Sequence, residues 1–327
     1  MRALVLLAAT VGATALTGVP AAQAASWTNQ SGAAYQTCTA GRTHNGVTYT
    51  TCIQHNAGFA KVRVVVKVAT TARRGVKASP YLRVPGRSNN ISAPSCSATL
   101  AGGAKKQCST AWLNANRIVQ NGNAAVWISG SRRPDMVVRG MNLDAKKQEN
   151  SVKYCGPATV QAALLTMKGS APSQDTLANS DNLQTNRYGF TWPYRLDDAL
   201  NRYKPSSVGR YALYDIAPVG QSSEIAFRLI HQSISAGQPV VYLVDPSKLP
   251  WSSNPTGTSV RHYILLHGYA AQKTTTDTNL NGGQIVHRFS AWDPARGTSH
   301  TITVPQLIRA STTSQYIDDN LVFAARK

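Results

Sequence analysis

One cysteine stands where its sulfur could do chemistry. Cys155 lies in the run Tyr-Cys-Gly-Pro-Ala-Thr, at the start of a helix that apolar spacing predicts over residues 157–167. The first turn of a helix gathers unpaired backbone N–H groups and the positive end of the helix dipole. This position favours the thiolate, which is the nucleophilic form of cysteine. The alternative is an inert buried cysteine, so the question is whether a base and an orienting group accompany it.

Two predicted strands supply such a pair. We expect strands over residues 262–269 and 284–293, joined by a polar loop. If they form a hairpin that turns near residues 277–278, His262 faces Asp293 across the ladder. An imidazole beside a carboxylate is the base and orienting group that a nucleophilic cysteine requires. A register slip of two residues would keep the pair on one face, whereas a slip of one would separate it.

The remaining polar candidates are weaker. His267 points to the other face of its strand, and His287 and His300 lack an equally placed acid, so we expect surface or packing roles for these three. An oxyanion would be bound by the backbone N–H of Cys155 and by a side-chain amide just upstream. Gln148 is the candidate for that amide, and Asn150 is the alternative.

The start of the chain and its other cysteines indicate export. Residues 1–24 combine an early arginine, an apolar stretch and an Ala-Gln-Ala cleavage site, which is typical of a secretory signal peptide. No later apolar run approaches the roughly 18 residues of a membrane span. We therefore expect a secreted, extracellular protein. Four cysteines allow three disulfide pairings, and short loops favour Cys38 with Cys52 and Cys96 with Cys108, which leaves Cys155 free.

Charge and hydropathy divide the mature chain in two. The pattern of residues 25–144 predicts a basic, β-rich domain of unknown role. Within it, residues 26–144 contain 15 Lys and Arg residues but only 2 acidic residues. Residues 145–327 read as helices followed by strands, an α+β pattern. The polar stretch 129–150 is the predicted linker. We expect the first domain to be a small antiparallel sandwich or barrel, and either a binding module or a pro-region.

The basic charge bears on partners. The net charge of the chain is +20. Such charge favours an anionic partner, for example a cell-envelope polymer, an acidic polysaccharide or nucleic acid, and the plain alternative is solubility. No nucleic-acid fold signature is present, so nucleic acid is the weakest of these partners.

Together these residues resemble the C39-like peptidases, which are papain-like cysteine proteases. The resemblance rests on Gln148, Tyr-Cys-Gly-Pro-Ala-Thr, Arg-His-Tyr at 261–263 and Trp-Asp-Pro at 292–294, and covers residues 145–327. It implies a papain-like α+β fold, no cofactor, and a peptide or protein substrate. By this resemblance Cys155 is the nucleophile, His262 the general base and acid, Asp293 the orienting group and Gln148 the oxyanion donor. The double-glycine leader specificity of transporter-fused relatives is not carried over, since this chain has no transporter.

Three classes of function follow from this reading. The first is a secreted cysteine peptidase that works through a thioester. The second is a cell-wall thiol amidase or acyltransferase on the same scaffold. The third is a non-catalytic binding protein of the cell envelope, which the complete set of nucleophile, base and orienting group disfavours.

Overall fold

The computed structural model describes most of the chain beyond the predicted signal peptide. The described residues are 26–31, 35–39, 41–56, 61–83, 91–92, 95–114, 120–133, 136–141, 143–150, 153–216, 221–252, 261–273, 284–311 and 321–327. The predicted signal peptide, residues 1–24, lies outside them. Below, the N-terminal half means residues 26–133 and the C-terminal half means residues 143–327.

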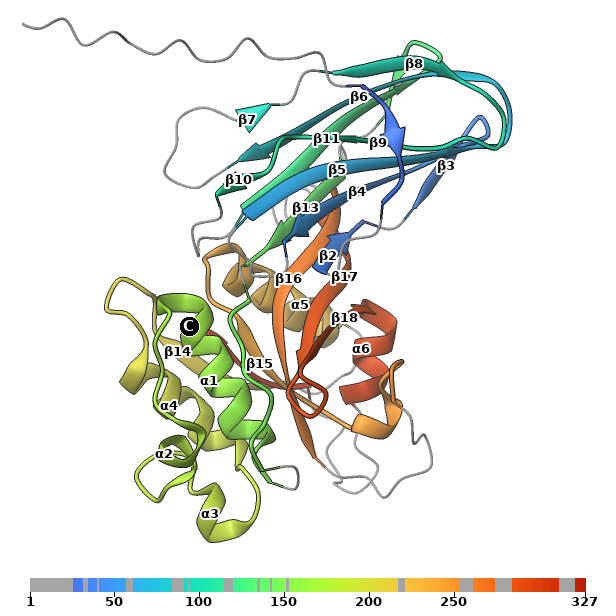
Figure 1. Cartoon of the computed structure of the whole chain (residues 1–327). Coiled ribbons are helices and arrows are strands. Elements are labelled where there is room, and N and C mark those ends of the chain that lie inside the picture. The colour runs from blue at the N-terminus through green and yellow to red at the C-terminus, as the bar shows by residue number, and fades with distance from the viewer. Residues whose placement is uncertain are drawn as a thin grey trace, which may run out of the picture.

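The N-terminal half is built of antiparallel strands in two facing layers (Figure 1). The first layer runs in the order β1 (Thr28–Asn29), β9 (Lys105–Ser109), β5 (Lys61–Thr70), β4 (Val47–His55), β2 (Tyr35–Cys38), with β10 (Leu113–Asn114) on β5 and β3 (Arg42–His44) on β4. The second contains β11 (Gln120–Ile128), β6 (Arg74–Arg83), β8 (Cys96–Leu100), β7 (Ile91–Ser92) and β12 (Ser131–Arg132). Valines that alternate along β5 are fully buried, as the sequence predicted.

Two disulfides fasten these strands. Cys38 bonds to Cys52 and links β2 to β4 within one layer. Cys96 bonds to Cys108 and links β8 to β9, which lie in different layers. This is the pairing that the short loops favoured. All five cysteines lie in described residues, and Cys155 is the one outside a disulfide.

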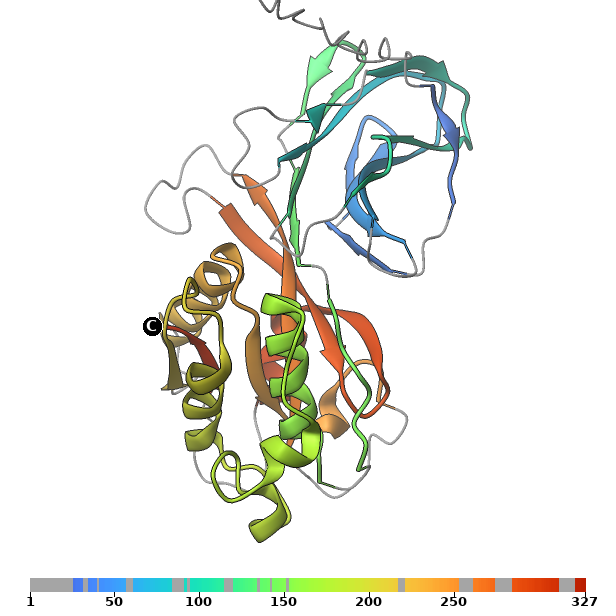
Figure 2. The ribbon, with the colours of Figure 1, turned by 60° about the vertical axis from the view of Figure 1, so that its left-hand side comes forward.

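The C-terminal half is a sheet covered by helices on both faces (Figures 1 and 2). Its strands run β14 (Tyr211–Ile216), β19 (Leu321–Arg326), β15 (Val240–Val244), β16 (His262–Lys273), β17 (Gln284–Asp293), β18 (Thr298–Thr303). The helices α1 (Cys155–Lys168), α2 (Gln174–Ala178) and α4 (Leu196–Tyr203) pack on one face. The helices α5 (Gln221–Ser235) and α6 (Val304–Ser311) pack on the other. The remaining short elements are α3 (Thr185–Tyr188), η1 (Pro193–Arg195) and η2 (Pro246–Lys248).

One strand joins the two halves. β13 (Met136–Gly140) pairs with β11 of the N-terminal half and with β16 of the C-terminal half. A single sheet of 12 strands therefore runs through both. The expectation of a polar linker over residues 129–150 is wrong for the part described, because Val137 and Val138 are buried between these neighbours. The β-branched residues within 136–139 favoured a strand here, but they did not predict its place between the two halves.

In the described part of the chain, no helix combines the length and the apolar character that crossing a membrane requires.

Candidate active site

The helix α1 begins at Cys155, so the thiol lies in its first turn. Tyr154 precedes it and makes no side-chain cap, which leaves the first N–H groups of the helix to other acceptors. Gly156 is required by packing, because a Cβ atom there would lie 2.2 Å from the hydroxyl oxygen of Thr191. The small residue after the cysteine therefore lets the helix start press against the segment that carries Thr191.

Thr159 ties the helix start to the strand that carries the histidine. Its hydroxyl lies 2.7 Å from the carbonyl oxygen of Cys155 and 3.3 Å from that of Tyr263. The hydroxyl of Tyr263 donates to the carbonyl of Thr191 at 2.9 Å. Thr159 is fully buried, so these bonds are shielded from water. The position of Cys155 against the first residues of β16 is thus fixed from both sides.

His262 and Asp293 meet directly. The Nε2 atom of His262 lies 2.9 Å from Oδ1 of Asp293, and both side chains are buried. The register differs from the predicted one by two residues, since Leu265 pairs with Trp292. Strand β16 ends at Lys273 and strand β17 begins at Gln284. The midpoint of the loop between them therefore lies further along the chain than the predicted turn near residues 277–278. A slip of two keeps the side-chain face, which is why the pair forms nonetheless.

Asp293 is held by two further donors. The indole N–H of Trp251 donates to Oδ2 at 2.9 Å, and the backbone N–H of Ala295 donates to Oδ1 at 2.9 Å. The Trp251 ring stacks on His300, with ring centroids 4.3 Å apart and planes inclined by 6°. The carboxylate therefore has little freedom to turn away from His262. Sequence reasoning missed Trp251, because no spacing or motif connects it to Asp293.

The pair is strongly polarised. Burial alone would lower the pKa of His262, but hydrogen bonds with Asp293 and Cys155, and the negative charges of both, raise it to about 9. Burial alone would raise the pKa of Asp293, but the bond to His262 and its charge, with the bonds from Trp251 and Ala295, lower it to about 2. His262 is therefore an imidazolium at neutral pH. Its Nε2 faces the carboxylate, so Nδ1 is left for the thiol of Cys155.

Gln148 lies beside the turn that follows Asp293. Its backbone N–H donates to the carbonyl of Pro294 at 3.0 Å. Its side-chain Nε2 donates to the carbonyl of Asn150 at 3.1 Å, while the buried Oε1 atom accepts no hydrogen bond from the described residues. An amide nitrogen carries two hydrogens, so one remains for another acceptor. Asn150, the alternative candidate, serves as the partner of Gln148.

The three histidines for which we predicted surface or packing roles take different places. His267 is buried at an irregularity of the β16–β17 ladder, between Leu266 and Gly268. His300 stacks on Trp251, and burial lowers its pKa, a shift that the charge of Asp293 opposes. The side chain of His287 lies outside the described residues.

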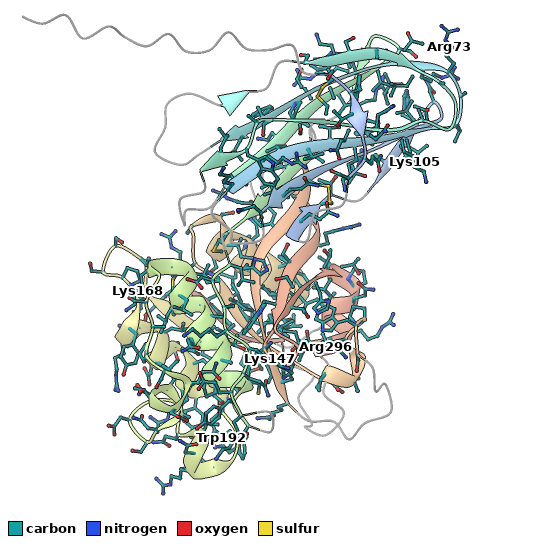
Figure 3. All side chains as sticks on the ribbon, in the orientation of Figure 1. Arg73, Lys105, Lys147, Lys168, Trp192 and Arg296 are labelled. Carbon is teal, nitrogen blue, oxygen red and sulfur yellow. A yellow bond between two sulfur atoms is a disulfide. The ribbon has the colours of Figure 1, made fainter. Side chains whose placement is uncertain are left out.

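A strip of four aromatic side chains lies near the start of α1, where Cys155 is located. The strip consists of Tyr188, Phe190, Trp192 and Tyr194, with successive ring centroids 6.4, 4.7 and 5.9 Å apart. Three of its members are unusually exposed for aromatic residues, at 40% for Tyr188, 41% for Phe190 and 50% for Tyr194. Figure 3 shows Trp192 at the opposite end of α1 from Lys168, which is the end where Cys155 lies.

The strip and the thiol share supporting residues. Thr191, inside the strip, is the residue that packs on Gly156 and accepts from Tyr263. The guanidinium of Arg261, next to His262 in sequence, lies 5.9 Å from the centre of the Trp192 ring. An exposed apolar surface therefore adjoins the residues that surround Cys155.

Among the residues that the structure describes, no group of three or more His, Cys, Asp or Glu side chains is placed to hold a metal ion.

Comparison with known families gives one match. The model of the Peptidase_C39 like family matches residues 141–317. This range spans more than half of the chain and contains Gln148, Cys155, His262 and Asp293. No curated protein matches the chain.

Proposed function

The chain belongs to the C39-like peptidase family, and on this premise we propose that it is a secreted cysteine peptidase with a papain-like catalytic half. Family membership supports a cysteine-type peptidase in general terms. The finer assignment is ours, and one observation carries it: His262 interacts with Asp293 on one side and with Cys155, at a helix start, on the other. This is the nucleophile, base and orienting group of thiol hydrolysis.

In the proposed reaction the thiolate of Cys155 attacks the carbonyl carbon of a peptide bond. The carbonyl π electrons move to oxygen and form a tetrahedral oxyanion. The imidazolium of His262 then gives its proton to the leaving amine, the C–N bond breaks, and a thioester remains. Neutral His262 next takes a proton from water, whose oxygen attacks the thioester. The acid product leaves, and the thiolate–imidazolium pair is restored.

The oxyanion needs donors that are already in place. The backbone N–H of Cys155 is one candidate, because the helix start has no side-chain cap. The second hydrogen on Nε2 of Gln148 is the other, since the first is held by Asn150. Gln148 is also anchored through its backbone beside Asp293, so its position is tied to that of the histidine pair.

Secretion and an anionic partner remain part of this proposal. The disulfides and the predicted signal peptide over residues 1–24 support an extracellular site of action. The excess of Lys and Arg in residues 26–144 supports attachment of the N-terminal half to an anionic cell-envelope polymer.

The first test is activity of the secreted protein on a peptide library and, in parallel, on a muropeptide digest. We expect cleavage of library peptides that stops when iodoacetamide alkylates Cys155, with the added mass located on that residue. Activity that survives complete alkylation would contradict the mechanism. Cleavage of muropeptides alone would replace the peptidase by a cell-wall amidase on the same scaffold.

The aromatic strip predicts a substrate preference. We propose that an extended peptide lies along the strip with bulky apolar side chains on Trp192 and its neighbours, because this surface is continuous with the residues around Cys155. Replacing Trp192 with alanine should raise KM about fivefold for peptides with such side chains, since one aromatic contact contributes about 1 kcal/mol. Trp112, on the N-terminal half and 39% exposed, gives the matched control: Trp112→Ala should leave KM unchanged. Equal KM values for Trp192→Ala and wild type would remove the strip from substrate binding.

A further inference from the structure

A concave surface lies in the N-terminal half, apart from the proposed catalytic residues. It is a shallow cavity of about 520 Å³ on the exposed face of β6, β8 and β11. Its lining includes Gly75, Lys77, Ser97, Thr99, Trp127 and Gly130. The strand register explains the grouping: Lys77 pairs with both Trp127 and Ser97, and Gly75 pairs with Thr99.

An aromatic ring lies between two cations here. The ammonium of Lys77 is 5.0 Å from the centre of the Trp127 ring, and the guanidinium carbon of Arg132 is 5.9 Å from it. Both residues are cross-strand neighbours of Trp127, on opposite sides. The surrounding segment adds to this charge, since residues 26–133 contain 14 Lys and Arg and no Asp or Glu. Arg73, at the end of this half farthest from the helices, marks the same region in Figure 3.

Gly75 has no evident structural reason to be glycine. It lies inside β6 without a positive φ angle, and a Cβ atom there would meet nothing within 4 Å. Glycine inside a strand is destabilising relative to alanine, so neither the backbone nor the packing accounts for it. Its effect is to leave the floor of the cavity open beside Trp127. Strand glycines often mark a place where a ligand approaches the backbone closely.

We propose that this cavity binds an acidic polysaccharide. The apolar face of one sugar ring would stack on Trp127, as amphipathic rings do on aromatic side chains. Its acid groups would form charge-assisted hydrogen bonds with Lys77 and Arg132. The hydroxyls of Ser97 and Thr99 would pair with sugar hydroxyls, since each can donate and accept. This site would hold the protein at an anionic polymer, and it depends on none of the catalytic residues.

The test measures binding of the full-length secreted protein to polygalacturonate, to neutral dextran and to a single-stranded DNA oligonucleotide. We expect polygalacturonate binding that weakens as salt rises, and no binding of dextran. Trp127→Ala, Lys77→Ala and Gly75→Thr should each raise the Kd about tenfold. Threonine suits a strand, so Gly75→Thr fills the cavity while the melting temperature is kept.

Lys61→Ala is the matched control, because Lys61 is exposed at the start of β5, at the end away from the β5–β6 turn. It should bind as wild type does. Three results would overturn the proposal: no binding of polygalacturonate, equal losses for Lys61→Ala and Lys77→Ala, or DNA binding that is as tight and equally dependent on Trp127. Peptide cleavage should be unchanged in all these variants, so failure here leaves the peptidase proposal standing.

Discussion

Replacing Cys155 with alanine should abolish peptide hydrolysis and leave the protein folded. The variant removes the sulfur that would form the thioester, and no described group stands in the same relation to His262. Loss of the nucleophile of a concerted catalytic set lowers kcat by at least about 10⁴-fold. The measurement is kcat/KM on a peptide that the library identifies, with thermal melting followed by circular dichroism.

The fold should survive this change for structural reasons. Cys155 is only partly buried and lies outside both disulfides, and alanine is the residue best suited to a helix. Cys155→Ser keeps the size of the side chain without an easily formed anion, so it should be nearly as inactive. Thr166→Ser, a small change on the same helix, is a control that should keep full activity. An alanine variant with more than about one per cent of wild-type turnover would exclude Cys155 as the nucleophile.

Local patterns predicted the parts of the site that lie within single elements. The run after Tyr154 predicted the helix at Cys155, and the assumed hairpin of two predicted strands predicted that His262 and Asp293 share a face. Strand β17 begins and ends at the predicted residues, Gln284 and Asp293. The exact register was wrong by two residues, because it depended on the length of a loop whose turn the sequence does not define.

Contacts between distant segments could not be predicted in this way. Trp251 reaches Asp293 across 42 residues, and Thr191 packs on Gly156 across 35. Neither Trp251 nor Thr191 belongs to a periodic sequence pattern that would predict its partner. The sharing of β13 between the two halves was hidden for a related reason, since a strand pairs according to what lies beside it in space.

Replacing Asp293 separates two roles of one carboxylate, orientation and charge. Asp293→Ala removes the acceptor of the His262 Nε2–H bond, and misplacement of a catalytic group by about 1 Å costs roughly 10²-fold. We therefore expect kcat/KM to fall by about 10²-fold or more. Asp293→Asn keeps an oxygen that accepts this bond, as in Cys-His-Asn sets, so its loss at the optimum pH should be smaller.

The pH profile distinguishes the two variants more sharply than the rate. The imidazolium of His262 persists up to its pKa of about 9, so wild-type kcat/KM should fall as pH rises through about 9. Removing the charge of Asp293 removes one cause of the raised pKa. The alkaline limb of Asp293→Asn should therefore move to lower pH, even if its optimum rate is close to that of wild type. An unmoved alkaline limb would show that His262 is not the titrating base.

The same shifts set the sign of the effect on stability. The pKa of His262 is raised on folding. Its contribution to the stability of the fold is therefore complete below about pH 6.5 and is lost as pH rises through about 9. The pKa of Asp293 is lowered to about 2, so its contribution is present above about 3.8 and is lost as pH falls through about 2. The melting temperature of wild type should therefore exceed that of the Asp293 variants by the largest margin between about pH 4 and 6.5. Thermal melting at several pH values measures this difference.

Trp251→Phe completes the series. Phenylalanine keeps a ring that can stack on His300 but has no N–H for Oδ2 of Asp293. One of the bonds that lower the pKa of Asp293 is lost, while the bond from Ala295 and the contact with His262 remain. Loss of one hydrogen bond to a charged group costs about 1.5–3 kcal/mol, so the melting temperature should fall while most activity is kept. Trp251→Phe could instead be as inactive as Asp293→Ala. That result would contradict the prediction, because it would show that Asp293 alone does not suffice to orient His262 or that Trp251 acts on the substrate itself.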